Sequence, residues 1–231
     1  MNDDLALTRL LQLASPTLPV GAYSYSQGLE AAVESGVVAT AADAEVWIGD
    51  MLRYSMVRLE APIWWRLYAA WAQRDMAGVR EWNDWFIVTR ETAELRAETL
   101  QMGYSLVRLL GDIASEGDGL EPGELQSLDA ISETAFPSAF TFAAVQWRIP
   151  ARNALNAYVW SWLENQVMAA LKAVPLGQTE GQRLLSRLGA KIVINLDEMI
   201  TIDPHEMNNY CHGLAIAASH HETQYSRLFR S

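Results

Sequence analysis

The sequence predicts an all-α fold, a single domain of about ten helices packed around a central helix, with a flexible C-terminal tail. Two observations predict it. Apolar residues recur at helical spacing in the longest segments, and no strands alternate with helices, so we expect no parallel sheet. The chain has 231 residues, half of them apolar, which is enough for one sizeable core. We assign residues 1–220 to the helical domain and 221–231 to the tail.

The first helices flank a loop. The leucines of residues 5–13 predict a short helix with Asp3 and Asp4 at its positive end. Ser24 and Gln27 have the spacing of a capping box, so we expect a helix over 24–35. Asp43 is expected to cap the next helix, and Pro62 to kink it or to begin a new one.

The later helices follow from apolar periodicity and from helix breakers. The clearest begins at Pro150 and ends before Pro175. Thr179 and Gln182 have capping-box spacing and predict the start of the following helix. Residues 192–194 read locally as a strand, but they lie within a helical pattern and are assigned to a helix. The expected later helices are about 75–85, 87–113, 123–134, 138–148, 150–174, 179–200 and 203–218.

Composition and charge exclude several classes of partner. The formal net charge is −11, which repels nucleic acid and anionic membrane, so neither is an expected partner. Cys211 is the one cysteine, and this fits a reducing compartment. The N-terminus lacks the regions of a signal peptide, and no apolar run approaches the ~20 residues of a membrane span. We expect a cytoplasmic protein.

Motifs of catalysis are not found. No phosphate-binding loop, nucleophile elbow or Glu-x-x-His pair occurs, so we expect a non-enzyme with no catalytic residue and no cofactor. The histidines lie late in the chain, and Cys211 and His212 are adjacent, so both cannot face one ion. A buried thiol beside a polar histidine is the favoured interpretation, and no metal site is assigned. The alternative is a weak nickel contact by His220, His221 or Cys211.

Two further clusters each have two interpretations. The first cluster is four tryptophans, which are expected to fill the core or a helical interface, although they could stack a ligand. These are Trp64, Trp65, Trp82 and Trp85. The charged residues Arg90, Glu91, Glu94 and Glu98 have helical spacing. This is typical of a solvated, salt-bridged helix face, and a recognition strip is the alternative.

The stretch from Ser15 to Glu30 has little conformational freedom. Pro16 and Pro19 fix their own φ, and Gly21 allows a positive φ. One interpretation is a tight loop that leads into a helix. The other is a rigid docking loop, because polar residues on a fixed loop are common binding groups.

The C-terminal tail combines apolar residues with arginines. Tyr225, Leu228 and Phe229 have no evident core to join, and Arg227 and Arg230 alternate with them. A frayed end is one interpretation. The other is a segment that is mobile in the free protein and orders on binding a partner, with aromatic and arginine anchors. The loop at Gly21–Tyr25 is the expected receiving surface.

Three segments together resemble one protein family. The loop stretch SPTLPVGAYSYSQGLE resembles the N-terminal signature of the urease accessory protein F family (UreF). Two further segments resemble the same family: VPLGQT at 174–179 with the following GQR, and HETQYSRLFRS at 221–231. The three lie at the beginning, late middle and end, so the resemblance spans nearly the whole chain.

The resemblance implies a non-enzymatic assembly factor. Family members act with accessory protein D (also called H) and the GTPase accessory protein G on urease apoprotein, and GTP hydrolysis drives nickel delivery. The F member is typically a homodimer that bridges the other two. One alternative is a catalytic role as GTPase activator, in which an arginine such as Arg227 enters the partner's nucleotide site. Another is an unrelated helical ligand-binding domain that uses the tryptophans.

The same segments supply the candidate site residues. The expected partner-binding residues are Tyr23, Tyr25, Ser26, Gln27, Glu30, His221, Glu222, Tyr225, Arg227, Leu228, Phe229 and Arg230. The expected structural turn residues are Pro16, Pro19, Gly21, Pro175, Gly177 and Gln178. Pro175 is expected to stop one helix, and Gly177 to permit the chain reversal.

Overall fold

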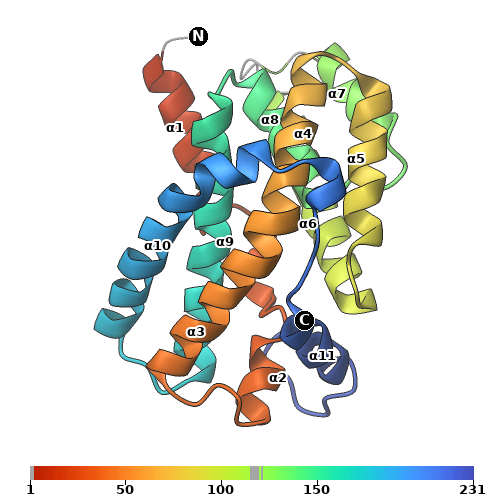
Figure 1. Ribbon diagram of the computed structural model, residues 1–231. Helices are drawn as coiled ribbons and strands as arrows, with labels where there is room; N and C mark the ends of the chain where they lie inside the picture. The colour runs from red at the N-terminus through yellow and green to blue at the C-terminus, as the bar shows by residue number, and fades with distance from the viewer. Residues whose placement is uncertain (1–2, 115–119, 121) are drawn as a thin grey trace.

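The computed structural model describes residues 3–114, 120 and 122–231, which form a single all-α domain (Figure 1). No strand occurs among them, and the predicted fold class is confirmed. The helices are α1 (Asp3–Leu13), α2 (Leu29–Glu34), α3 (Ala41–Met51), α4 (Ala61–Ala72), α5 (Met76–Val88), α6 (Ala93–Ala114), α7 (Pro122–Asp129), α8 (Phe136–Gln146), α9 (Ala151–Ala173), α10 (Gln178–Thr201) and α11 (His212–His221).

Helix α9 is the central element. It packs against α10 along much of its length, and also contacts α1, α2, α4 and α8 (Figure 1). It begins after Pro150, whose ring fixes φ at its helix-compatible value. Leu155, Val159, Leu163 and Val167 are fully buried at four-residue spacing, so one face of the helix lies in the core.

Helices α3 and α4 are joined by a nine-residue π-helical segment, Leu52–Glu60, and no loop separates them. Pro62 has no N–H to donate to the Arg58 carbonyl. The backbone N–H of Asn208 reaches that oxygen at 3.3 Å, and Tyr210 N–H reaches the Tyr54 carbonyl at 3.3 Å. The alternative in which a new helix begins near Pro62 is confirmed, because α4 begins at Ala61 with Pro62 in its first turn. The two long-range donors come from the segment before α11.

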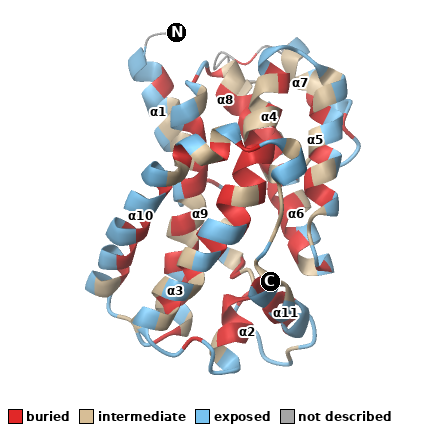
Figure 2. Ribbon diagram, viewed as in Figure 1, coloured by how far each residue is buried: buried red, intermediate tan, exposed pale blue. Residues whose placement is uncertain are grey.

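Aromatic side chains fill the core between α4, α8 and α9. Trp64 is fully buried; its ring stacks on Tyr68 at 5.7 Å and lies 6.2 Å from that of Phe140. Buried residues follow the inner faces of the long helices in Figure 2. Trp82 and Trp85 contact each other at 4.9 Å and pack on a smaller cluster around Phe86. Core filling therefore describes the tryptophans at these positions.

Several predicted boundaries are wrong. No helix begins at Ser24: a short 3₁₀ turn covers Ala22–Ser24, and α2 begins at Leu29 after Gly28. Thr40, not Asp43 alone, caps α3, with Asp43 completing the capping box. The long helix starts at Ala93, because the chain turns between α5 and α6. The expected last helix divides into a 3₁₀ turn at Pro204–Glu206 and α11.

The turn between α9 and α10 is also simpler than expected. Pro175 does follow the end of α9, but Gly177 has φ −81° and open space where a Cβ would lie. A glycine is not required there for conformation. Helix α10 begins at Gln178 with no side-chain cap, so the Thr179–Gln182 capping box is wrong.

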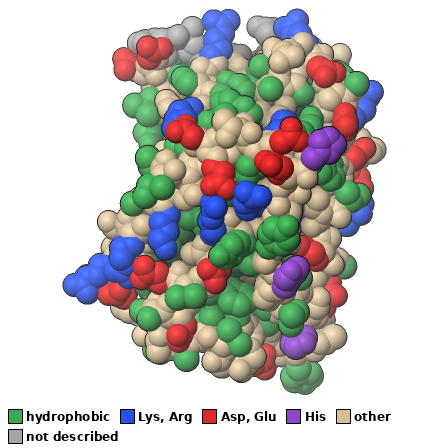
Figure 3. Space-filling model, viewed as in Figure 1, with side chains coloured by type: hydrophobic (Ala, Val, Ile, Leu, Met, Phe, Trp, Pro, Cys, Tyr) green, Lys and Arg blue, Asp and Glu red, His purple; other side chains and the backbone are tan. Residues whose placement is uncertain are grey.

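Acidic and basic side chains are interleaved on the surface seen in Figure 3. Arg187 pairs with Glu45 and Glu180, and Arg53 pairs with Glu198, so these ion pairs join α10 to α3 and the π-helical segment. Within the described ranges, no helix is long and apolar enough to span a membrane.

Candidate partner-binding site

The loop that precedes α2 is held in a defined conformation. Gly21 has φ 80°, as its position predicts, and it starts the 3₁₀ turn. Gln27 and Gly28 are both left-handed, with φ 53° and 78°. A left-handed glutamine is strained. Such strain persists only where surrounding contacts determine the backbone.

The C-terminal tail supplies part of those contacts. Arg230 N–H donates to the Ser24 carbonyl at 2.7 Å, and Ser26 N–H donates to the Ser231 backbone oxygen at 2.7 Å. The Ser26 hydroxyl donates to the same oxygen at 2.6 Å. The tail therefore lies along the loop, as the receiving-surface prediction requires. The expected flexibility of the tail is not confirmed.

Glu30 binds the tail backbone. Its carboxylate accepts hydrogen bonds from Leu228 N–H at 2.6 Å and from Phe229 N–H at 3.0 Å. The same carboxylate lies 3.3 Å from His221 Nε2. Glu30 is buried, as is the Phe229 ring. A carboxylate that accepts backbone N–H groups in this way makes strong, charge-assisted bonds.

Glu94 on α6 binds the tail side chains. One of its oxygens lies 2.6 Å from His221 Nδ1, and the other accepts from the Arg227 guanidinium. Its backbone N–H donates to the Glu222 carboxylate at 3.3 Å. Arg227 thus pairs with a carboxylate on α6.

Glu98, one turn further along α6, connects loop and tail. It accepts from the Gln27 amide at 2.8 Å and from the Ser231 hydroxyl at 2.8 Å. Burial raises the pKa of Glu98 to about 7, and these two hydrogen bonds oppose the rise only in part. Glu94 and Glu98 therefore contact the tail of the same chain, so a solvated face does not describe these two residues, and the recognition strip stays a prediction.

Helix α9 holds the loop from the other side. Trp162 Nε1 donates to the Gln27 side chain at 2.8 Å, and Asn165 donates to the Tyr25 carbonyl at 3.1 Å. The Lys172 ammonium lies 5.9 Å from the Tyr23 ring centre and 5.3 Å from that of Phe229. One cation thus contacts an aromatic ring of the loop and one of the tail.

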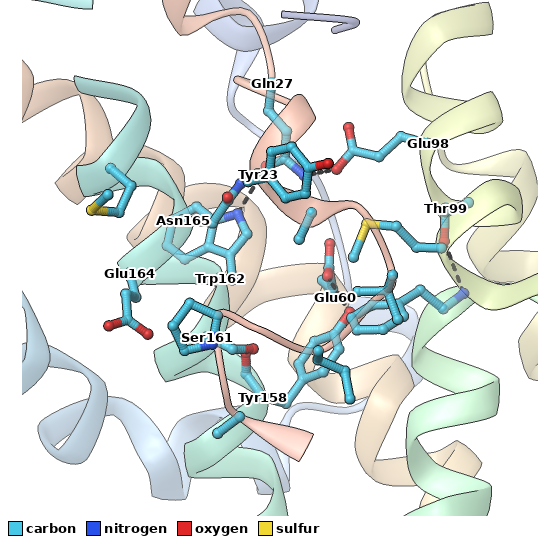
Figure 4. Close-up of a pocket in the computed structure, with 18 of the residues that line it drawn as sticks. Tyr23, Gln27, Glu60, Glu98, Thr99, Tyr158, Ser161, Trp162, Glu164 and Asn165 are labelled. Atoms are coloured by element: carbon cyan, nitrogen blue, oxygen red, sulfur yellow. Dashed lines mark hydrogen bonds between the residues drawn. The ribbon is translucent and has the colours of Figure 1, made fainter. Parts of the chain in front are cut away.

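A cavity of about 280 Å³ lies beneath the loop (Figure 4). Its apolar walls include Leu18, Met102 and Phe136. Its polar lining includes Glu60, which accepts from the Tyr158 hydroxyl at 2.6 Å and pairs with Arg90 at 3.1 Å. Burial and the nearby Glu60 charge raise the pKa of Tyr158 well above its usual value, so the phenol stays protonated.

The predicted partner-binding residues differ in burial, and Gln27 is partly buried. Tyr25, Ser26, Glu30, His221 and Phe229 are buried, and they join the loop to the tail. The exposed residues are Tyr23, Glu222, Tyr225, Arg227, Leu228 and Arg230. Pro16, Pro19, Pro175 and Gln178 are exposed at their turns. We call the loop residues 23–30, the tail residues 221–231 and the two α6 carboxylates Glu94 and Glu98 the loop–tail site.

Sequence reasoning missed the supporting residues on α9, and it did not assign Glu94 and Glu98 to the site. Helical spacing did indicate the α6 carboxylates as a possible strip. No local signal marks Trp162 or Asn165, because their partners lie 135 and 140 residues away in the chain. Lys172 has none either, because its two aromatic partners lie in the loop and in the tail.

The histidine and cysteine side chains do not converge. His221 lies between two carboxylates on opposite ring nitrogens, whereas His220 is exposed. Cys211 is half-buried, not fully buried, and burial raises the pKa of its thiol. In the part of the chain that the structure describes, no group of three His, Cys, Asp or Glu side chains is arranged to hold a metal ion.

The fold and the site define a class of protein. Helices carry a paired loop and tail whose outer side chains are aromatic, apolar and basic, as in helical proteins that bind other proteins. A family model described as UreF matches residues 38–189. The chain belongs to the UreF family of urease accessory proteins.

Curated relatives extend the match beyond those residues. The chain is 60% identical to urease accessory protein UreF of Azoarcus sp. strain BH72 over 227 residues, covering 98% of this chain and 96% of the relative. It is 47% identical to the protein of the same name from Methylobacillus flagellatus over 231 residues, which is the full length of both chains. The protein of that name from Dechloromonas aromatica is 49% identical, again over both full lengths.

Proposed function

We propose that this protein is a non-enzymatic assembly factor in urease maturation. In this role it bridges accessory protein D (H) and the GTPase accessory protein G on urease apoprotein, so that GTP hydrolysis by protein G drives nickel insertion. Family membership supports the role in urease maturation. The single structural observation that supports a bridging role is the loop–tail site, which presents exposed aromatic and apolar side chains on a hydrogen-bonded backbone.

The exposed side chains of the site are suited to a partner interface. Tyr225 is fully exposed and Leu228 is 72% exposed, although Glu30 binds the backbone N–H groups of Leu228 and Phe229. Tyr23 is 65% exposed on the adjoining loop. Aromatic anchors on a backbone that is already ordered bind at lower entropic cost.

Co-purification tests the proposal. Tyr225→Ala should reduce recovery of accessory proteins D and G with the tagged chain about tenfold or more, as expected for loss of an aromatic hot spot. Urease activation in a reconstituted assay should fall with it. Tyr104→Ala on α6 is the matched control, since Tyr104 is also more than half exposed but lies outside the site. Equal loss in both variants, or in neither, would count against the loop–tail site as the binding surface.

A second candidate role is the supply of an arginine to the GTPase partner. Arg230 is exposed at the loop–tail site, so its guanidinium is accessible to a bound partner. An arginine finger is sensitive to replacement by lysine because lysine lacks the planar fork. Arg230→Lys that retains binding but loses stimulation of GTP hydrolysis would favour this role, and unchanged stimulation would exclude Arg230 from it.

A further inference from the structure

His221 lies where α11 ends and the tail begins, and its side chain is fully buried. Its two ring nitrogens face two different carboxylates. Nδ1 lies 2.6 Å from Glu94 and Nε2 lies 3.3 Å from Glu30. The ring therefore connects α6 to α2 through α11.

The protonation state of the ring decides how many of these contacts are hydrogen bonds. A neutral imidazole has one N–H, so it donates to one carboxylate and turns a lone pair toward the other. An imidazolium has two N–H groups and donates to both. Both carboxylates can therefore accept a hydrogen bond from the ring only when both ring nitrogens carry a proton.

The charges around the ring agree. Glu30 faces it from α2, Glu94 faces it from α6, and Arg227 reaches Glu94 from the tail. With an imidazolium, this cluster holds two positive and two negative charges. With a neutral ring, one buried negative charge has no counterpart, which is costly in a dry environment. Glu222 and His220 on the same helix are exposed, and Glu98 faces Ser231 from the next turn of α6.

Both carboxylates also hold the tail. Glu30 accepts from Leu228 and Phe229 N–H, and Glu94 binds Arg227. We propose that His221, as an imidazolium, is the positioning residue of the loop–tail site: it fixes both carboxylates in the orientation that holds the tail. This inference rests on the proposed function only for the biological use of the site. Loss of the ring proton removes one bond and unbalances the cluster, so the tail is held at lower pH and loosened at higher pH.

The test uses the full chain without partners. Ring ¹⁵N shifts of labelled histidine report the protonation of His221, and hydrogen-exchange protection of the Leu228 and Phe229 amides reports tail docking. We expect the doubly protonated signature at low pH. As the ring loses its proton, protection corrected for intrinsic exchange should fall about tenfold or more, as expected for one charge-assisted bond. Because Glu98 also titrates, the same series is recorded in Glu98→Gln, where the transition should persist.

Variants separate positioning from a merely structural role. His221→Gln, made in the Glu98→Gln background so that Glu98 does not titrate, should give low protection without the pH transition of the ring. The exposed neighbour change His220→Gln should keep the wild-type profile. If His221→Gln fails to fold, the wild type still decides the proposal. Ring titration and loss of amide protection at the same pH would support it, and transitions at different pH values would contradict it. A ring that shows one neutral tautomer at every pH, with protection unchanged in Glu30→Gln, would mean that Glu30 carries the proton and would overturn it. The two proposals can fail separately. If tail protection changes with pH as expected but Tyr225→Ala does not affect partner recruitment, the result counts against the proposed function alone.

Discussion

At the scale of single residues, Glu98 is the side chain most sensitive to its surroundings. It is buried between α6, the loop and the tail, and its pKa of about 7 reflects burial of a group whose usual value is 4.5. Both hydrogen bonds that it makes are to donors, the Gln27 amide and the Ser231 hydroxyl. A glutamine has nearly the same shape and carries no charge to bury; its oxygen can accept from the Gln27 amide, and its –NH2 can donate to the Ser231 hydroxyl oxygen.

We therefore expect Glu98→Gln to be more stable than the wild type at alkaline pH. The folded state holds a proton that the unfolded state releases between about pH 4.5 and 7, so wild-type stability falls as pH rises through this window. The full penalty, about 3 kcal/mol, is present above pH 7. Urea unfolding at several pH values measures the difference in free energy of unfolding between Glu98→Gln and the wild type. This difference should be small near pH 5 and largest near pH 8. Parallel curves for the two proteins would contradict the assignment.

At the scale of elements, close packing of α6 against the chain before α8 depends on Gly103. A Cβ at this position would lie 2.0 Å from the Thr134 carbonyl oxygen and 3.0 Å from the Phe136 nitrogen. That nitrogen donates to Thr99, one turn earlier on α6, at 3.1 Å. The backbone segment cannot move away without breaking this bond.

Gly103→Ala should lower the free energy of unfolding by more than about 2 kcal/mol, because backbone atoms must shift to admit the methyl group. Gly111→Ala is the matched control on the same helix. Nothing lies within 4 Å of a Cβ at Gly111, so alanine should be neutral or stabilise by up to about 1 kcal/mol through its helix propensity. Chemical denaturation of both variants checks the pair. Similar effects of the two changes would show that the contact at Gly103 relaxes easily.

Elements with local causes were predictable from the sequence. Apolar spacing gave α9 and α10 within a few residues, and it correctly placed Ile192–Ile194 in a helix. The π-helical segment was not predictable, because the donors to Tyr54 and Arg58 come from residues about 150 positions later. The start of α2 was misplaced because a long-range contact is involved here too. The Ser26 hydroxyl accepts a local hydrogen bond from Glu30 N–H, and it also donates to the Ser231 backbone oxygen, 205 residues later.

At the scale of the whole molecule, the loop before α2 and the C-terminal tail meet, although the first helix, α1, lies at the far end of the molecule (Figure 1). The sequence indicated that loop and tail belong together, because both carry family segments and polar-aromatic composition. It did not indicate which atoms join them, since Glu30, Glu94 and Glu98 resemble ordinary charged helix residues until the fold brings the tail to them. Lys172 was missed altogether, because its contacts with Tyr23 and Phe229 form only when the loop and the tail are folded beside α9.

We also propose that the protein is a homodimer. Large apolar side chains remain exposed on α3, α10 and α11, among them Val46, Ile194 and Ile216. Such side chains are commonly covered when a second copy binds. Sedimentation at ~10–50 µM, above the range in which weak dimers dissociate, should give twice the mass of one chain. A single-chain mass across that range would argue against the dimer.

The bond between the Ser26 hydroxyl and the Ser231 backbone oxygen joins residues 205 positions apart. Contacts of such sequence separation form late in folding, because the entropy of closing the loop must first be offset by the structure in between. The tail can dock only after α2 and α6 have assembled, since each contributes a carboxylate that it binds. A partner that recognises the docked tail is therefore expected to select completed molecules and to pass over chains that are still folding.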